Sequence, residues 1–173
     1  MGRGGCSLAL LVGFAAGVAH AGDPTLPAGL PESRVVRVVD GDTVVVRSEG
    51  REETVRLIGI DTPEARESEK LERDSRRQGR DRVAIQAMGA RATKFTQAHV
   101  LARSVFVERD VRLRDRYGRR LAYLWLADGR LFNAELVREG YAVAMTVPPN
   151  VKYAAHFVRL EREARAGRRG LWE

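Results

Sequence analysis

The sequence predicts an α+β domain built on a small five-stranded Greek-key barrel that three helices cover. Five short segments are rich in β-branched and aromatic residues, and turn signals such as Asp40-Gly41 and Asp115-Arg116-Tyr117-Gly118 separate them. A long helical pattern falls between the third and the fourth segment, and two further helical patterns follow the fifth. The chain contains no internal repeat. Together these features favour one barrel domain.

The five strands are expected over residues 34–39, 43–47, 53–60, 104–108 and 119–126. In the third of them, Val55 and Leu57 are apolar at odd positions, and Ile58 and Ile60 are apolar at even positions. This strand is therefore expected to be covered on both faces. Arg56 lies on one of these apolar rows, and a buried arginine requires a partner or a function because burial of an unpaired charge is costly.

The helices are expected over residues 83–100, from residue 133 to before Gly140, and over about 151–166. The first has apolar residues at spacings of three and four, including Met88, Ala92 and Phe95. Asn133 is the expected N-cap of the short second helix. Gly167 is the expected end of the last helix. Five short strands with one helix between the third and the fourth are the outline of an OB-fold.

The first 21 residues are expected to be a cleavable signal peptide, with an uncleaved anchor as the alternative. Residues 8–19 are apolar but too short to span a bilayer, and Ala19-His20-Ala21 matches the small-x-small cleavage pattern. We expect cleavage near Ala21 and Gly22, secretion or release into the periplasm, and no stable membrane association afterwards. The proline-containing segment that follows is expected to be a flexible leader. The chain thus divides into residues 1–21, 22–33 and 34–173.

The charge and the cysteine content limit what the mature chain can bind. The full sequence has 30 Lys and Arg against 23 Asp and Glu, a formal net charge of +7. A basic, arginine-rich domain favours polyanions such as nucleic acid, anionic lipid or acidic glycans. Cys6, the one cysteine, is expected to leave with the signal peptide. Disulfides and thiolate metal sites are therefore excluded, and oxygen atoms or the two remaining histidines would have to hold any metal.

Two acidic segments lie at the ends of neighbouring predicted strands. Asp42 shares strand parity with the apolar residues after it, and Asp61 follows directly after the third strand. If these strands pair, both carboxylates reach one site at the barrel mouth, where a bound cation or a raised pKa would relieve their repulsion. With the backbone carbonyl of Thr62 they form a set of oxygen ligands, which favours Ca²⁺ or Mg²⁺.

The residues around this site suit phosphodiester hydrolysis. Glu64 lies close enough to a metal at Asp61 to orient or deprotonate an attacking water. Arg56 and Arg119 offer guanidinium groups for a phosphate and for the charge of its transition state. Each motif also has a purely structural interpretation: Asp-Gly as a hairpin turn, residues 61–64 as a capping box, and Arg119 as a cap of the preceding turn.

Residues 65–82 are highly charged, with seven basic and five acidic residues among eighteen positions. The segment is expected to be a solvated loop or a frayed helical extension. Because acids and bases are mixed through it, we favour a solvated insertion over a flap that contacts nucleic acid.

The sequence resembles the staphylococcal nuclease family (the thermonucleases) from about Val35 to Trp172. The matching blocks are VVDGDTV at 38–44, VRLIGIDTPE at 55–64, DRYGRRLAY at 115–123 and NAELVREG at 133–140. The resemblance implies an OB-fold barrel with three helices. It also implies Ca²⁺-dependent hydrolysis of DNA and RNA by water attack on phosphorus, which leaves 3′-phosphates and 5′-hydroxyls.

The resemblance also implies roles for individual residues. Asp42 and Asp61 match the calcium carboxylates of the family, and Thr62 matches the carbonyl ligand. Glu64 matches the general base.

The remaining matches concern the phosphate. Arg56 and Arg119 match the phosphate-binding arginines, and Arg116 and Tyr117 match a basic residue and a tyrosine beside the terminal phosphate. The chain departs from the family at Met145 and Val147, where its best-known member has two tyrosines that help to hold a base. Base stacking should therefore be weaker here.

These observations predict a secreted, calcium-dependent, sugar-non-specific endonuclease that acts as a monomer on DNA and RNA, with single strands preferred. One alternative is a non-catalytic OB-fold module that binds single-stranded nucleic acid, which would not require Asp42, Asp61 and Glu64 to converge. Another is a structural or adhesive domain stabilised by calcium, which would leave Arg56 and Arg119 without a role.

Overall fold

The computed structural model describes residues 22–65, 71–72, 75–76, 79 and 81–173. The expected signal peptide, residues 1–21, lies outside these residues, and so does most of the charged stretch 65–82. In the described part of that stretch, Leu71 is fully buried, whereas Glu72 and Arg76 are exposed. No helix in the described ranges combines the length and the apolar character needed to cross a membrane.

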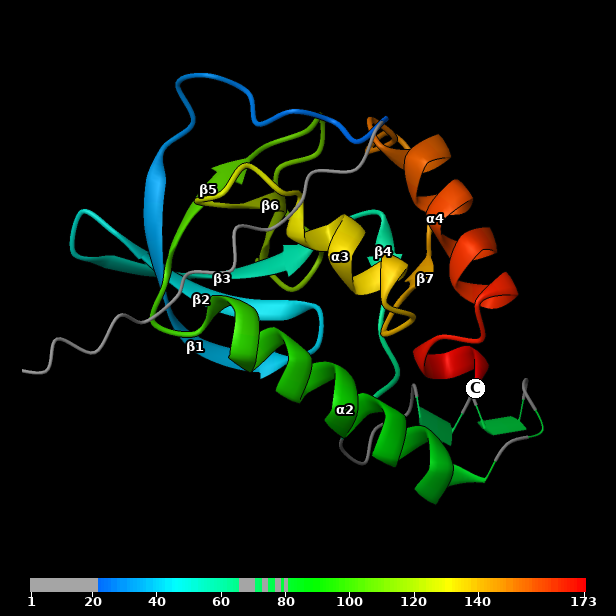
Figure 1. Cartoon of the computed structure of the whole chain (residues 1–173). Helices are drawn as coiled ribbons and strands as arrows, with labels where there is room; N and C mark the ends of the chain where they lie inside the picture. The colour runs from blue at the N-terminus through cyan, green and yellow to red at the C-terminus, as the bar shows by residue number, and fades with distance from the viewer. Residues whose placement is uncertain (1–21, 66–70, 73–74, 77–78, 80) are drawn as a thin grey trace, which may run out of the picture.

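A closed five-stranded barrel with the strand order β1-β2-β3-β6-β5 forms the body of the molecule (Figure 1). Its strands are β1 (Glu32–Asp40), β2 (Thr43–Ser48), β3 (Arg51–Leu57), β5 (Ser104–Glu108) and β6 (Arg120–Leu126). All neighbouring strands are antiparallel except β3 and β6, which are parallel. The predicted OB-fold barrel is confirmed, and each predicted strand overlaps an observed one.

The third predicted strand, 53–60, is divided in the structure, which corrects the sequence prediction. β3 ends at Leu57, and a separate strand β4 (Ile60–Asp61) pairs with β7 (Val143–Ala144). Gly59 makes this break, because its φ of +81° is a left-handed conformation and a Cβ there would lie 2.4 Å from the ring of Phe157. The break turns Asp61 away from the barrel ladder and towards its mouth.

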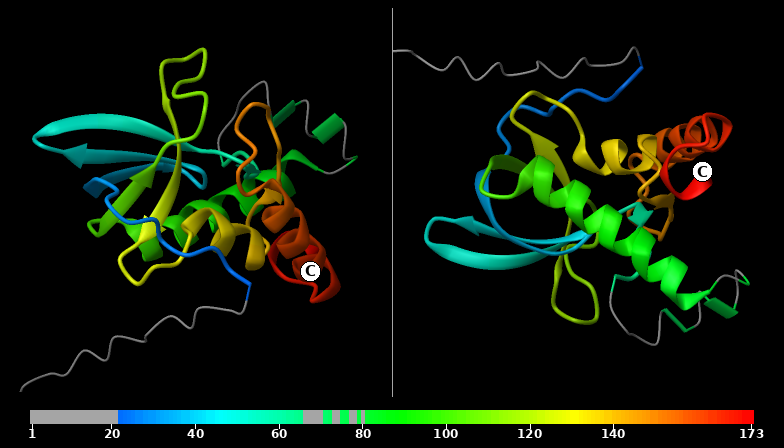
Figure 2. Two further views of the ribbon diagram at one scale, coloured as in Figure 1. Left: turned by 90° about the horizontal axis from the view of Figure 1, so that it is seen from above. Right: turned by 60° about the horizontal axis from the view of Figure 1, so that its bottom comes forward.

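In the part of the chain that the structure describes, the barrel is covered by the helices α2 (Arg82–Val100), α3 (Phe132–Arg138) and α4 (Ala154–Ala166), and a short 3₁₀ turn η1 (Gly170–Trp172) follows. α2 crosses one end of the barrel against β1, whereas α3 lies between β6 and α4 (Figures 1 and 2). Asn133 is not the N-cap of α3, since Leu131 holds that position. Instead, the buried Asn133 amide accepts a hydrogen bond from Leu124 N and donates one to Ile58 O, both 2.9 Å long.

Residues 22–33 lie against the domain, which differs from the unpaired leader that the sequence suggested. Glu32 and Ser33 already belong to β1 and pair with β5. Leu26 and Leu30 pack against the core. Asp23 accepts two hydrogen bonds of 2.6 Å from the Arg138 guanidinium. Two partly buried leucines and the ion pairs of Asp23 therefore hold this segment against the domain, although its prolines suggested a flexible leader.

Candidate active site

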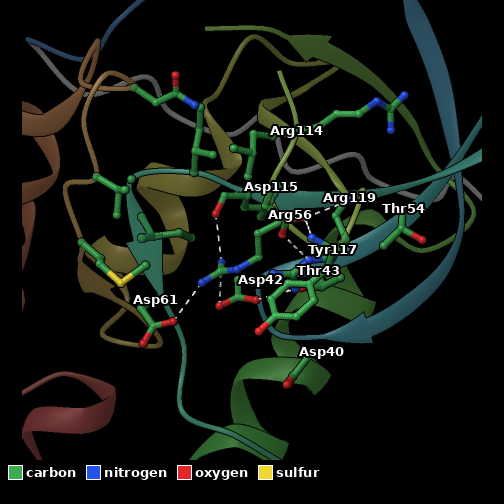
Figure 3. Close-up of a pocket in the computed structure, with 18 of the residues that line it drawn as sticks. Asp40, Asp42, Thr43, Thr54, Arg56, Asp61, Arg114, Asp115, Tyr117 and Arg119 are labelled. Carbon is green, nitrogen blue, oxygen red and sulfur yellow. Dashed lines mark hydrogen bonds and ion pairs between the residues drawn. The ribbon is translucent and has the colours of Figure 1, made fainter. Parts of the chain in front are cut away.

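A pocket of about 1280 Å³ opens at the mouth of the barrel, beside the loop between β5 and β6 (Figure 3). The structure brings seven of the eight predicted site residues to its lining: Asp42, Arg56, Asp61, Glu64, Arg116, Tyr117 and Arg119. Thr62, the eighth, is buried behind the lining and contacts Asp42. Residues far apart in the sequence are therefore assembled at one place.

Asp42 is the most tightly held of these groups, and it is only 5% exposed. Its Oδ2 accepts hydrogen bonds from the backbone N–H and the hydroxyl of Thr62, both 2.9 Å long, and its Oδ1 accepts one from the Thr43 hydroxyl. The turn that carries Asp42 is fixed by α2, because the Thr96 hydroxyl donates a 2.6 Å hydrogen bond to Gly41 O. A Cβ on Gly41 would lie 2.9 Å from Ala92, so the turn requires glycine at this position.

Arg56 links the two carboxylates that the sequence placed at a cation site. Its Nη1 lies 2.8 Å from Asp42 Oδ2, and its Nη2 lies 2.9 Å from Asp61 Oδ1 (Figure 3). Nη1 also donates to Leu57 O. The Arg56 side chain is 12% exposed, so the guanidinium is a largely desolvated cation between two acids. The expectation that a buried arginine at this position has partners is met by these contacts.

Asp40 is a further carboxylate in the lining of the pocket, beside Asp42, Asp61 and Glu64. Its Oδ1 accepts hydrogen bonds from Gly41 N and from the Thr93 hydroxyl. Burial, with additional repulsion from Asp42 and Glu64, raises the pKa of Asp40 above its ordinary value. Burial is the main cause of this shift, because it disfavours the charged form of the carboxyl group.

Arg119 is held by Asp115, a residue that the sequence reasoning treated only as part of a turn. Asp115 Oδ1 accepts hydrogen bonds from the backbone N–H groups of Tyr117 (2.9 Å) and Arg119 (3.0 Å), and Oδ2 accepts one from Arg119 Nε (2.7 Å). Partial burial raises the pKa of Asp115, but the hydrogen bonds from Arg119 and Tyr117 outweigh it and hold the pKa below its ordinary value. An acid four residues before an arginine was the available sequence signal.

Tyr117 and Arg116 form the exposed rim of the same loop. Tyr117 is 67% exposed. The guanidinium carbons of Arg116 and Arg119 lie 4.8 Å and 5.5 Å from the centre of its ring. Two cations therefore lie close to the Tyr117 ring at the exposed edge of the pocket.

The opposite lip of the pocket is apolar and is tied to this loop by Asn150. The Asn150 amide accepts a 2.7 Å hydrogen bond from Arg112 N and donates a 2.9 Å hydrogen bond to Arg112 O. Met145 and Val147 lie on this lip and are 39% and 50% exposed. Sequence reasoning found these two residues only as a departure from the family pattern, and it missed the Asn150 link.

Among the described residues, no group of three or more His, Cys, Asp and Glu side chains converges as metal ligands. Asp42 and Asp61 instead share one cation, Arg56, with oxygen atoms at 2.8 and 2.9 Å from its nitrogens. Asp42 and Asp61 therefore already face a common cation, and the Thr62 backbone lies beside Asp42. Together they offer a set of oxygen donors. Such a set fits a hard divalent cation better than zinc or copper.

Comparisons with known proteins agree with this geometry. The family described as "Staphylococcal nuclease homologue" matches residues 54–173. The chain is 38% identical over 139 residues to the thermonuclease of Staphylococcus intermedius, a match that covers 80% of this chain and 74% of that protein. It is 34% identical over 139 residues to the thermonuclease of Staphylococcus hyicus, with the same coverage of 80% and 74%. It is also 33% identical over 138 residues to endonuclease YncB of Bacillus subtilis (strain 168), which covers 79% of this chain and 59% of that protein. The chain belongs to the staphylococcal nuclease family, as its sequence motifs predicted.

Proposed function

We propose that this protein is a secreted, Ca²⁺-dependent endonuclease that hydrolyses phosphodiester bonds of DNA and RNA. The observation that carries the proposal is the convergence of Asp42, Asp61, Glu64 and two arginines on one pocket. A binding module would gain nothing from three acids in a site for a polyanion, because they repel the phosphates. Membership of the nuclease family supports the same activity.

Asp42 and Asp61, with the backbone carbonyl of Thr62, are the proposed calcium ligands. When bound there, calcium would neutralise charge that develops on the phosphate and help to polarise it. The donor set fits this role because it consists of oxygen atoms and leaves positions for water and substrate. Arg56, which already contacts both carboxylates, then lies beside the phosphate that the cation attracts.

Glu64 is the proposed base. Its carboxylate orients a water molecule and accepts its proton as the water oxygen attacks phosphorus. The new P–O bond forms as the bond to the 5′-oxygen breaks, so the products are a 3′-phosphate and, once the leaving oxygen takes up a proton, a 5′-hydroxyl. Arg56 and Arg119 stabilise the additional negative charge of the five-coordinate transition state through their N–H groups.

Single strands are the preferred substrate in this proposal, because the apolar lip at Met145 and Val147 can contact an unpaired base. Aliphatic contacts replace stacking there, so affinity for each base should fall short of the 1–3 kcal/mol or so that an aromatic platform contributes. Nothing in this site requires a second subunit, and we propose a monomer. Arg116 and Tyr117 bind the adjacent phosphate.

The first experiment measures degradation of single-stranded DNA and of RNA by the purified protein, with Ca²⁺ and with a chelator. Calcium-dependent cleavage of both is expected. Glu64→Gln should reduce turnover by about 10²-fold or more while calcium binding, followed by calorimetry, is retained. Salt-sensitive binding of single strands without any cleavage would instead establish the non-catalytic binding module.

A further inference from the structure

The loop of residues 109–119 contains a carboxylate whose position a turn alone does not explain. Asp115 Oδ1 accepts hydrogen bonds from the backbone N–H groups of Tyr117 and Arg119, and these two hydrogen bonds already close the turn. The second oxygen, Oδ2, is not needed for the turn. It accepts a 2.7 Å hydrogen bond from Nε of Arg119 (Figure 3).

The contact of Asp115 with Arg119 leaves the two Nη atoms of the guanidinium available. The hydrogen bond goes to Nε, on the side of the group nearest the backbone. Both Nη atoms thus remain for a ligand, and they form the fork that pairs with two oxygens of a phosphate. A carboxylate that only neutralised Arg119 would be expected to bond the two Nη atoms itself.

A second aspartate–arginine pair provides this contrast within the same molecule. Asp128 Oδ1 also accepts the backbone N–H of Arg130, but its Oδ2 bonds both Nε (3.0 Å) and Nη2 (2.7 Å) of that arginine. The remaining Nη1 of Arg130 bonds Glu135. All three guanidinium nitrogens of Arg130 therefore bond carboxylates. Neither Arg130 nor Asp128 lines the large pocket.

The arginines that flank Arg119 do not compete for Asp115. Arg114 and Arg120 both pair with Glu53 on β3, and Arg114 also donates to Gly118 O. Asp115 is partly buried, and its lowered pKa keeps its carboxylate ionised well into the acidic range. A charged carboxylate therefore holds Arg119 at neutral pH.

We propose that Asp115 is a positioning residue of the nuclease, which orients the Arg119 guanidinium so that both Nη groups face the phosphate in the transition state. The inference rests on the proposed role of Arg119. Asp115 is then a further acidic residue of the site, but it contacts Arg119 and lies outside the cation site. Loss of the Asp115 carboxylate should lower kcat, because Asp115 acts through Arg119, a group that stabilises the transition state.

The test uses Asp115→Asn, which keeps Oδ1 as the acceptor for the turn but places an amide N–H against Arg119 Nε. We expect kcat to fall by about tenfold or more with KM changed by less than about threefold, because a misplacement of about 1 Å can reduce turnover by up to 10²-fold. Asp128→Asn is the matched control. It also weakens an aspartate–arginine ion pair, but one away from the pocket, so it should lower stability and leave kcat unchanged.

A double-mutant comparison separates positioning from a general structural effect. If Asp115 acts through Arg119, Asp115→Asn should not slow the Arg119→Ala variant any further. A kcat of Asp115→Asn that equals or exceeds that of the wild type would overturn the inference, and so would an additive loss in the Arg119→Ala background. Should thermal melting show that Asp115→Asn is unfolded, Asp115→Ser, which retains an acceptor for the turn, takes its place.

The same set of variants distinguishes failure of this inference from failure of the proposed role of Arg119. A wild-type kcat for Arg119→Ala would contradict the role of the arginine itself. A slow Arg119→Ala with a normal Asp115→Asn would contradict only the positioning role of Asp115.

Discussion

Replacement of Arg56 by methionine removes the guanidinium that joins Asp42 to Asp61 while preserving much of the side-chain volume. Arg56 is 12% exposed, and its nitrogens lie 2.8 and 2.9 Å from the two carboxylates. Removing one partner from a largely buried ion pair typically costs about 3–5 kcal/mol, because the remaining charge is left uncompensated. Here two acids lose their shared cation, so we expect the free energy of unfolding in chelator to fall by at least about 3 kcal/mol.

Calcium should restore stability to this variant more than it stabilises the wild type. In the wild type, calcium has to bind beside a positive charge, whereas in Arg56→Met the two carboxylates are free of that charge. Calcium affinity should therefore rise by about tenfold or more, which corresponds to about 1.4 kcal/mol. Urea denaturation with and without Ca²⁺, together with calorimetric titration of calcium, measures both quantities. Turnover of nucleic acid should fall.

Arg130→Met is the control, because Arg130 also joins two carboxylates, Asp128 at 2.7 Å and Glu135 at 2.6 Å, away from the large pocket. It should lose stability without a stronger response to calcium. An equal calcium response in Arg56→Met and Arg130→Met would refute the reasoning, because calcium would then bind somewhere other than at Asp42 and Asp61.

Three further predictions concern the fork geometry, a buried amide and the pH dependence of stability. Arg56→Lys should reduce kcat about as much as Arg56→Ala, by about 10²–10³-fold, because a lysine cannot reproduce a two-pronged phosphate contact; restored activity in the lysine variant would contradict this. Asn133→Leu should lower the free energy of unfolding by about 3 kcal/mol in urea denaturation, since it leaves Leu124 N and Ile58 O buried without partners. Burial lowers the pKa of His156, so the unfolded chain takes up a proton near pH 6.5 while the folded protein does not; stability should fall as the pH drops through that value, and His156→Gln should reduce the slope.

The strands and the acidic ends of β1 and β4 could be predicted because local patterns determine them. Alternating or continuous apolar residues mark the strands, and the two Asp-containing motifs follow directly after them. The break at Gly59 could not be predicted from periodicity, because Leu57, Ile58 and Ile60 are apolar on both faces. Its cause is a contact with Phe157, nearly a hundred residues later in the sequence.

Long-range contacts also explain the remaining errors. Asn133 looks like an N-cap in the sequence, since asparagine is common there. In the structure its amide instead satisfies the backbones of β6 and the β3–β4 connection, which only the tertiary fold brings together. The contact of Asp115 with Arg119 could not be predicted from the turn motif, because it depends on the conformation of the whole turn.

The short pairing of β4 with β7 has a consequence for the timing of assembly. Ile60 pairs with Ala144, and Met145 N donates to Gly59 O. The segment that carries Asp61 therefore gains its ladder partner only when the chain has been synthesised past residue 145. Contacts of such sequence separation form late, because closing a long loop is entropically costly. The strand that carries Asp61 is therefore fixed in place only when β7 has folded against it, so the pocket is completed late in folding.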